Sequence, residues 1–117
     1  MIAYLAGPMT GYPRWNFDAF DEAAAKLRRR GFTVLSPAEM DRANGFNPDA
    51  PVEDYTLEDR QKALRADLNA VIRVAEAVVY LPGSEDSTGA NLEMSVALAI
   101  GKPVVPLAYA LLKGTSL

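Results

Sequence analysis

Two carboxylates in this sequence stand where their surroundings favour unusual chemistry. Asp67 lies three residues after Leu64 and four before Val71, so it projects from the apolar face of its own predicted helix. A carboxylate there is unfavourable unless it is paired or neutral. The position therefore predicts either a buried ion pair with an arginine or a general acid whose pKa is raised by burial.

Glu93 follows the loop of residues 84–89 and falls in the first turns of a later predicted helix. The positive end of the helix dipole favours the ionised form, which suits a nucleophile. A first-turn glutamate that only stabilises its helix is the alternative. Because Asp67 is under the opposite pressure, the pair suggests glycoside-type chemistry.

Tyr4 lies in the first predicted strand, one side chain from the loop of residues 7–14. It is either a core aromatic or a residue of the site. Gly7 and Gly11 would let the backbone approach a ligand, and free N–H groups there could hold an anion. The sequence GPMTG is neither the dinucleotide fingerprint nor a P-loop, so an ordinary loop is the alternative.

Composition limits what the protein can be. Its 117 residues predict one domain over residues 1–117, and 50% apolar with 23% charged residues is typical of a globular fold. The net charge of −3 argues against a binder of nucleic-acid polymers. There is no Cys and no His, which excludes these nucleophiles and makes a zinc site very improbable. We expect neither metal nor cofactor.

The first residues lack the charged and apolar regions of a signal peptide. No segment approaches about 18 uninterrupted apolar residues, so no membrane span is expected. We therefore expect a cytoplasmic protein.

Strands alternate with helices along the chain. The predicted strands span residues 2–6, 32–35, 77–81 and 104–107. The helix signals are Asn16 and Gly31 for the first helix, Thr56 and Asp59 for the second, and Ser87 or Thr88 with Gly101 for the third. This order predicts an α/β fold: a flavodoxin-like or Rossmann-like three-layer sandwich with a four- to five-stranded parallel sheet.

Two helices have predicted buried faces. The inward residues are Leu64, Leu68, Val71, Ile72 and Ala75 in the second helix, and Leu92, Val96, Ala99 and Ile100 in the third. From residue 108 the tail is expected to form one helical turn and then fray. Residues 38–56 are polar and show no clear period, which predicts a lid, a binding loop or a plain excursion.

In parallel sheets, sites gather at the carboxyl ends of the strands. This selects the loops of residues 7–14, 36–56 and 82–91. A small enzyme or nucleotide-binding module with a carboxylate pair is as far as these residues lead.

Three short motifs carry a family resemblance. They are residues 4–8 (YLAGP), residues 65–69 (RADLN), and a signature made of Ser87, Thr88, Gly89, Glu93, Ala97 and residues 101–103 (GKP). Together they resemble the nucleoside 2-deoxyribosyltransferases and their small relatives, the deoxynucleoside 5′-monophosphate N-glycosidases. The match runs in order over nearly the whole chain and looks closest to the compact phage and bacterial branch.

The resemblance implies a mechanism. Glu93 would attack C1′ of the sugar and form a covalent intermediate, Asp67 would handle the proton of the departing base, and Tyr4 would position Glu93 by a hydrogen bond. The implied substrate-binding residues are Gly7, Pro8, Met9, Gly11, Ser87, Gly89 and Asn91. Family sites are commonly completed by a neighbouring subunit, so we expect a homodimer or a larger even homo-oligomer.

One departure from the family pattern bears on the substrate. Where the nucleoside transferases carry Asp, this chain has Ser87, as the monophosphate N-glycosidases do. A hydroxyl and helix-start N–H groups favour a phosphate, although Glu85 and Asp86 weaken the argument. The leading prediction is therefore hydrolysis of the N-glycosidic bond of a (deoxy)nucleoside 5′-monophosphate.

Two alternatives remain open: base exchange between deoxynucleosides, and a non-catalytic nucleotide-sensing module. The sequence does not name the base. Trp15, Phe46 and Tyr55 could stack on one, but stacking tolerates any base.

Overall fold

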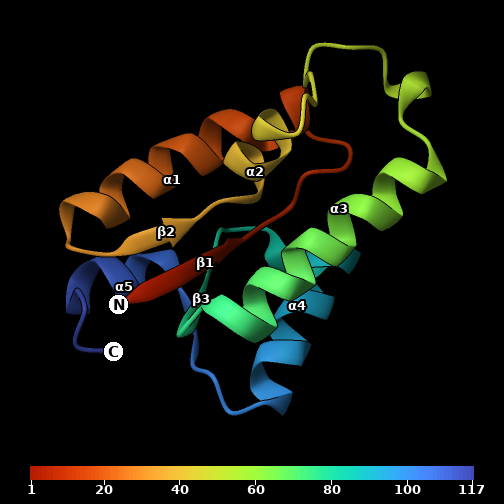
Figure 1. Ribbon diagram of the computed structural model, residues 1–117. Helices are drawn as coiled ribbons and strands as arrows, with labels where there is room; N and C mark the ends of the chain where they lie inside the picture. The colour runs from red at the N-terminus through yellow and green to blue at the C-terminus, as the bar shows by residue number, and fades with distance from the viewer.

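The computed structural model describes residues 1–117 as a four-stranded parallel sheet between layers of helices (Figure 1). The strands are β1 (Ile2–Ala6), β2 (Thr33–Leu35), β3 (Ala77–Tyr80) and β4 (Val104–Pro106), in the order β2-β1-β3-β4. Their alternation with helices predicted this parallel, flavodoxin-like sandwich, and the prediction is confirmed.

The helices are α1 (Phe17–Arg29), α2 (Pro37–Ala43), α3 (Leu57–Asn69), α4 (Thr88–Ala99) and α5 (Leu107–Lys113). A π-helical turn, Ala70–Val74, continues α3. Single 3₁₀ turns lie at Pro13–Asn16, Val52–Asp54 and Ser84–Asp86. None of these helices is long and apolar enough to cross a membrane.

Side chains along β1 point alternately to the two faces of the sheet, and this alternation sets the direction of Tyr4. Ala3 and Leu5 face a core shared with α1 and α5, whereas Tyr4 and Ala6 face the other core, which contains residues of α4. Tyr4 is therefore directed toward α4, although it lies in the centre of the sheet, opposite Leu35 and Val78.

The buried face of α4 differs from the prediction. The helix turns Ala90, Glu93 and Ala97 inward, whereas Leu92 and Ile100 are 39% and 46% exposed. Of the residues predicted to face inward, Ala99 is also exposed and Val96 is half-buried. Apolar residues surround the whole of α4, so their spacing does not select a face, and the small alanines are the residues that let the helix approach the sheet.

The second predicted face is correct only in part. Val71 and Ala75 are buried and Leu64 and Leu68 are half-buried, but Ile72 is 49% exposed. The reason is the π turn, in which the N–H of Ala75 donates to the carbonyl of Ala70. A turn of five residues rotates Ile72 out of the row that a regular α-helix would give it.

Helix α2 lies where the sequence predicted irregular chain. Ser36 and Pro37, which directly follow the predicted strand of residues 32–35, begin a helix, with Ser36 at the N-cap and Pro37 in the first turn. The helix has only seven residues, three of them charged, which is too short for a helical period to be visible. The tail likewise forms a helix, α5, anchored by the buried Ala110.

The predicted starts of α3 and α1 are both found, although only the first is capped as predicted. Thr56 and Asp59 form the predicted capping box of α3. Asn16 is the N-cap residue of α1, but its side chain does not cap the helix and donates instead to the carbonyl of Pro8, at 2.9 Å.

Candidate active site

Three side chains predicted to act together meet at the carboxyl end of the sheet. The Tyr4 hydroxyl, from β1, donates a hydrogen bond of 2.8 Å to Oε2 of Glu93, from α4. Tyr4 is fully buried and Glu93 is 6% exposed. Asp67, from α3, completes the group, because it lines the same cavity as Glu93 and its charge raises the pKa of both Tyr4 and Glu93.

Asp67 forms no ion pair, so the ion-pair alternative is wrong. The ion pairs of the molecule join Arg14, Lys26, Arg28 and Arg42 to other carboxylates. Oδ1 of Asp67 is buried and has no hydrogen-bond partner. A buried oxygen without a partner is costly in a folded protein, so this one is available to a ligand rather than to the fold.

Burial raises the pKa of Asp67 to about 7 and that of Glu93 to about 8. The helix dipole favours an ionised Glu93, but desolvation acts against it and raises the pKa, and repulsion by the charge of Asp67 adds to the rise. Two such neighbours titrate as a pair that holds one proton near neutral pH. The pKa of Glu93 is the higher of the two, but the 2.8 Å hydrogen bond from Tyr4 stabilises its carboxylate, and the mechanism proposed below uses the arrangement with Glu93 ionised and the proton on Asp67.

A third carboxyl group, Asp41 on α2, escaped the sequence prediction. Desolvation raises its pKa to about 6, and its charge contributes to the raised pKa of both Asp67 and Glu93. The signal that could have found it is the helix start at Ser36 and Pro37. Once α2 is drawn, Asp41 falls three residues after the buried Ala38 and so on the same side of the helix.

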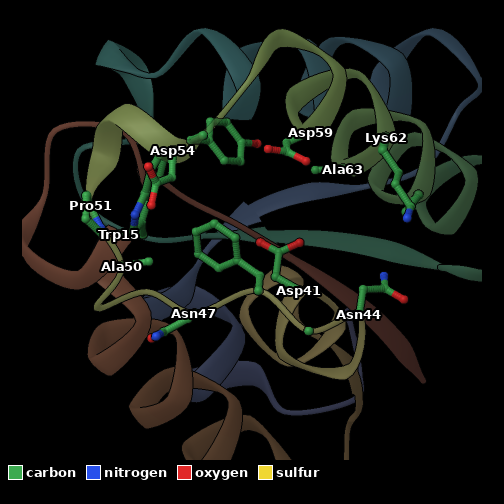
Figure 2. Close-up of a pocket in the computed structure, with 14 residues that line it drawn as sticks. Trp15, Asp41, Asn44, Asn47, Ala50, Pro51, Asp54, Asp59, Lys62 and Ala63 are labelled. Carbon is green, nitrogen blue, oxygen red and sulfur yellow. The ribbon is translucent and has the colours of Figure 1, made fainter.

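Two adjoining cavities open at these groups. The smaller, of about 140 Å³, contains the Asp67 and Glu93 side chains in its wall, and we call it the reactive pocket. The larger, of about 440 Å³, we call the outer chamber. Asp41 borders both, and Figure 2 shows its carboxylate directed from α2 across the outer chamber toward Ala63 on α3.

Trp15, Phe46 and Tyr55 also line both cavities, and they pack on one another. The ring centroids are 5.5 Å apart for Trp15 and Phe46, 4.8 Å for Trp15 and Tyr55, and 5.8 Å for Phe46 and Tyr55. This aromatic cluster ties the turn after β1 to the segment after α2. Part of each ring is thus already covered, which limits the area left for stacking on a base.

Four of the seven expected substrate-binding residues line the reactive pocket: Gly7, Met9, Ser87 and Gly89. Pro8, Gly11 and Asn91 do not. The Pro8 carbonyl accepts from Asn16, and the Asn91 amide donates to the carbonyl of Glu85.

The two pocket glycines differ in what their small size provides. A Cβ on Gly7 would come within 2.9 Å of both Leu81 and Phe20, so the core requires glycine there, where we expected it to make room for a ligand. A Cβ on Gly89 would meet nothing within 4 Å, so the space beside Gly89 is open.

Ser87 is the N-cap residue of α4. Its Oγ accepts the N–H of Ala90 at 3.2 Å, so the hydroxyl proton is still free to be donated. The N–H groups of Thr88 and Gly89, in the first turn, have no carbonyl partner within the helix. No group of three or more Asp and Glu side chains is arranged to hold a metal ion.

The model of the family described as "Domain of unknown function (DUF4406)" matches residues 1–106. The chain belongs to the DUF4406 family. A solved structure of a 2-deoxyribosyltransferase from the psychrotolerant bacterium Bacillus psychrosaccharolyticus is similar to this DUF4406 chain, with a TM-score of 0.65 and 26% identity. The similarity covers 91% of this chain and 71% of the other. Comparison with curated proteins found no significant match.

Proposed function

We propose that this protein is an enzyme that cleaves the N-glycosidic bond of nucleosides or nucleotides. The observation that carries the proposal is the joining of Tyr4, Asp67 and Glu93 in one buried group. The similarity to a 2-deoxyribosyltransferase supports glycosyl transfer as the reaction class. A pure binding module would not need an unpaired, protonated carboxyl group beside a second carboxylate, which argues against the sensing alternative.

The first step is displacement at C1′. The carboxylate of Glu93 attacks C1′ through Oε1, because Oε2 is held by Tyr4. The bond from C1′ to the base nitrogen breaks, its electron pair stays on the base, and Asp67 donates its proton to the base. The products are a glycosyl ester of Glu93, the free base and ionised Asp67.

The second step restores the enzyme. Water attacks C1′, the ester bond to Glu93 breaks, and Asp67 takes up the proton of the water. The hydrogen bond that holds Oε2 of Glu93 supports this covalent route, because it leaves Oε1 for the attack on C1′. The effect of each carboxyl group on the pKa of the other supports their acting as a pair on one sugar.

Within this class we propose a (deoxy)nucleoside 5′-monophosphate as substrate and water as acceptor. Ser87 supports this, since it offers a hydroxyl proton to a phosphate where a carboxylate would repel one. Base exchange between deoxynucleosides is the second candidate, favoured by the similarity to a 2-deoxyribosyltransferase. We also propose a homo-oligomer, because α4 exposes Leu92, Leu98 and Ile100.

The test is incubation with a panel of nucleosides and their 5′-monophosphates, followed by chromatography for free base. We expect base and sugar phosphate from a monophosphate, at a rate that an added second base does not change. Formation of a new nucleoside from the added base would instead establish the transferase. Absence of any base release, from a folded protein over the whole panel, would refute the proposal.

A further inference from the structure

Arg60, on α3, is placed to act on the same substrate but has no partner of its own. Residues 60, 64 and 67 are spaced by four and three, so they share one face of α3, and all three line the reactive pocket. Arg60 lies two turns from Asp67 toward the beginning of the helix, a rise of about 10 Å. The face that carries the proposed acid thus also carries a cation.

The guanidinium group of Arg60 is not used by the fold. Arg14, Arg28 and Arg42 each bind a carboxylate at 2.5–2.8 Å, whereas Arg60 has neither an ion pair nor a side-chain hydrogen bond. The nearby Asp59 is engaged in the capping box with Thr56. Five N–H donors therefore remain free beside the pocket.

The charges around the reactive pocket make that cation significant. Asp41, Asp67 and Glu93 are acidic, and Arg60 is the one basic side chain that lines the pocket. An anionic ligand that entered without a counter-charge would meet only repulsion. In a nucleotide the phosphate is attached to C5′, away from the reacting C1′. The cation that binds it should therefore lie away from Glu93, and Arg60 meets this condition.

We propose that Arg60 binds the 5′-phosphate of the substrate and gives the pocket its preference for a nucleotide over a nucleoside. The inference rests on the proposed function and deepens it. The first turn of α4 lies across the same pocket, because Ser87, Thr88 and Gly89 line it together with Arg60. Helices α3 and α4 contact each other, and Figure 1 shows α3 in front of α4. Arginine suits this role because its planar fork matches two phosphate oxygens at once.

A structural role is the competing explanation. The charge of Arg60 lowers the pKa of Tyr55 against the larger upward effect of burial, so the guanidinium lies near that ring. In that role Arg60 would only support the aromatic cluster. Such a support would affect a nucleoside and its monophosphate equally, and this difference separates the two roles.

The experiment compares wild type with Arg60→Gln, Arg60→Lys and Arg73→Gln. Arg73 is an exposed arginine on the π turn that borders neither cavity, so it controls for the loss of one positive charge. For each protein, kcat/KM is measured with one nucleoside and with its 5′-monophosphate, and folding is checked by thermal melting.

We expect Arg60→Gln to lower kcat/KM for the monophosphate at least tenfold, mainly through KM, and to leave the nucleoside within about twofold. Arg60→Lys should retain part of the preference, and Arg73→Gln all of it. Inorganic phosphate should inhibit nucleoside cleavage by wild type and not by Arg60→Gln. Equal losses for both substrates, or no preference in wild type, would overturn the inference.

The inference can fail independently of the proposed function. If wild type releases no base from any substrate, the function is wrong, and calorimetric titration with a nucleoside monophosphate then tests Arg60 alone. Weaker binding by Arg60→Gln than by Arg73→Gln would support a phosphate site. Unchanged binding would refute it.

Discussion

Replacing Asp67 by Asn should stabilise the fold and abolish most of the activity. Burial raises the pKa of Asp67 from an ordinary value of 3.8 to about 7. In the unfolded chain the same carboxyl group ionises near pH 4, so the folded state holds a proton that the unfolded state has released. The contribution of Asp67 to the free energy of unfolding therefore falls as pH rises from about 4 to about 7 and then stays constant.

The size of the effect follows from the two pKa values. A rise of about 3 corresponds to about 4 kcal/mol at 1.36 kcal/mol for each pKa unit. The proton is shared with Glu93, so we assign roughly half of this cost to Asp67. Above pH 7 the free energy of unfolding of Asp67→Asn should therefore exceed that of wild type by about 2 kcal/mol. For a domain of this size that is a rise in Tm of about 5–10 °C. Below pH 4 the two proteins should melt alike.

The assay is thermal and urea unfolding at pH 4 and pH 8, together with base release at pH 7. Base release by Asp67→Asn should fall by about 10²–10⁴-fold, the contribution of a general acid. Asp86→Asn, an exposed change, is the control for stability and should alter the melting temperature at neither pH. An Asp67→Asn protein that melts below wild type at pH 8 and releases base at the wild-type rate would refute the reasoning.

Three further predictions concern the groups around Asp67. Glu93→Ala should cost several orders of magnitude in turnover while the fold survives, as judged by circular dichroism; near-normal turnover in a folded protein would exclude the covalent route. Wild-type turnover should decline tenfold per pH unit above about pH 7, because Asp67 loses its proton there. Asp41→Asn should move that decline to lower pH, because the negative charge of Asp41 helps to keep Asp67 protonated. An unchanged pH profile would show that Asp41 is only structural. Ser87→Asp should erase or reverse a preference for monophosphates, measured as paired kcat/KM values, and a preserved preference would place the phosphate elsewhere.

The order of the four strands and of the three longer helices, α1, α3 and α4, could be predicted because each of these elements carries local sequence signals. Glycine at φ 93° ends α1 at Gly31, and the capping box at Thr56 begins α3. The three residues that form the buried group were also predictable, but through different signals: a carboxylate on an apolar face for Asp67, and a motif match for Tyr4 and Glu93.

What the sequence could not predict depends on three-dimensional surroundings. The raised pKa of Glu93 comes from burial under neighbours far along the chain, which acts against the local helix dipole. Asp41 lies in a helix of one to two turns, too short for a period to be seen. The exposure of Ile72 depends on a π turn, and no residue type marks such a turn in advance.

The small side chains on the inner face of α4 have a consequence for redesign of this protein. Ala90 and Ala97 flank Glu93 and let its helix sit close against the sheet, which is how a tyrosine in β1 reaches the glutamate at 2.8 Å. Neither alanine has a polar side-chain atom that could react, yet their volume sets the spacing between donor and acceptor. In directed evolution of this protein, positions 90 and 97 would therefore adjust the catalytic geometry. A single carbon added at either alanine would move α4 away from the sheet and lengthen the distance between the Tyr4 hydroxyl and Glu93.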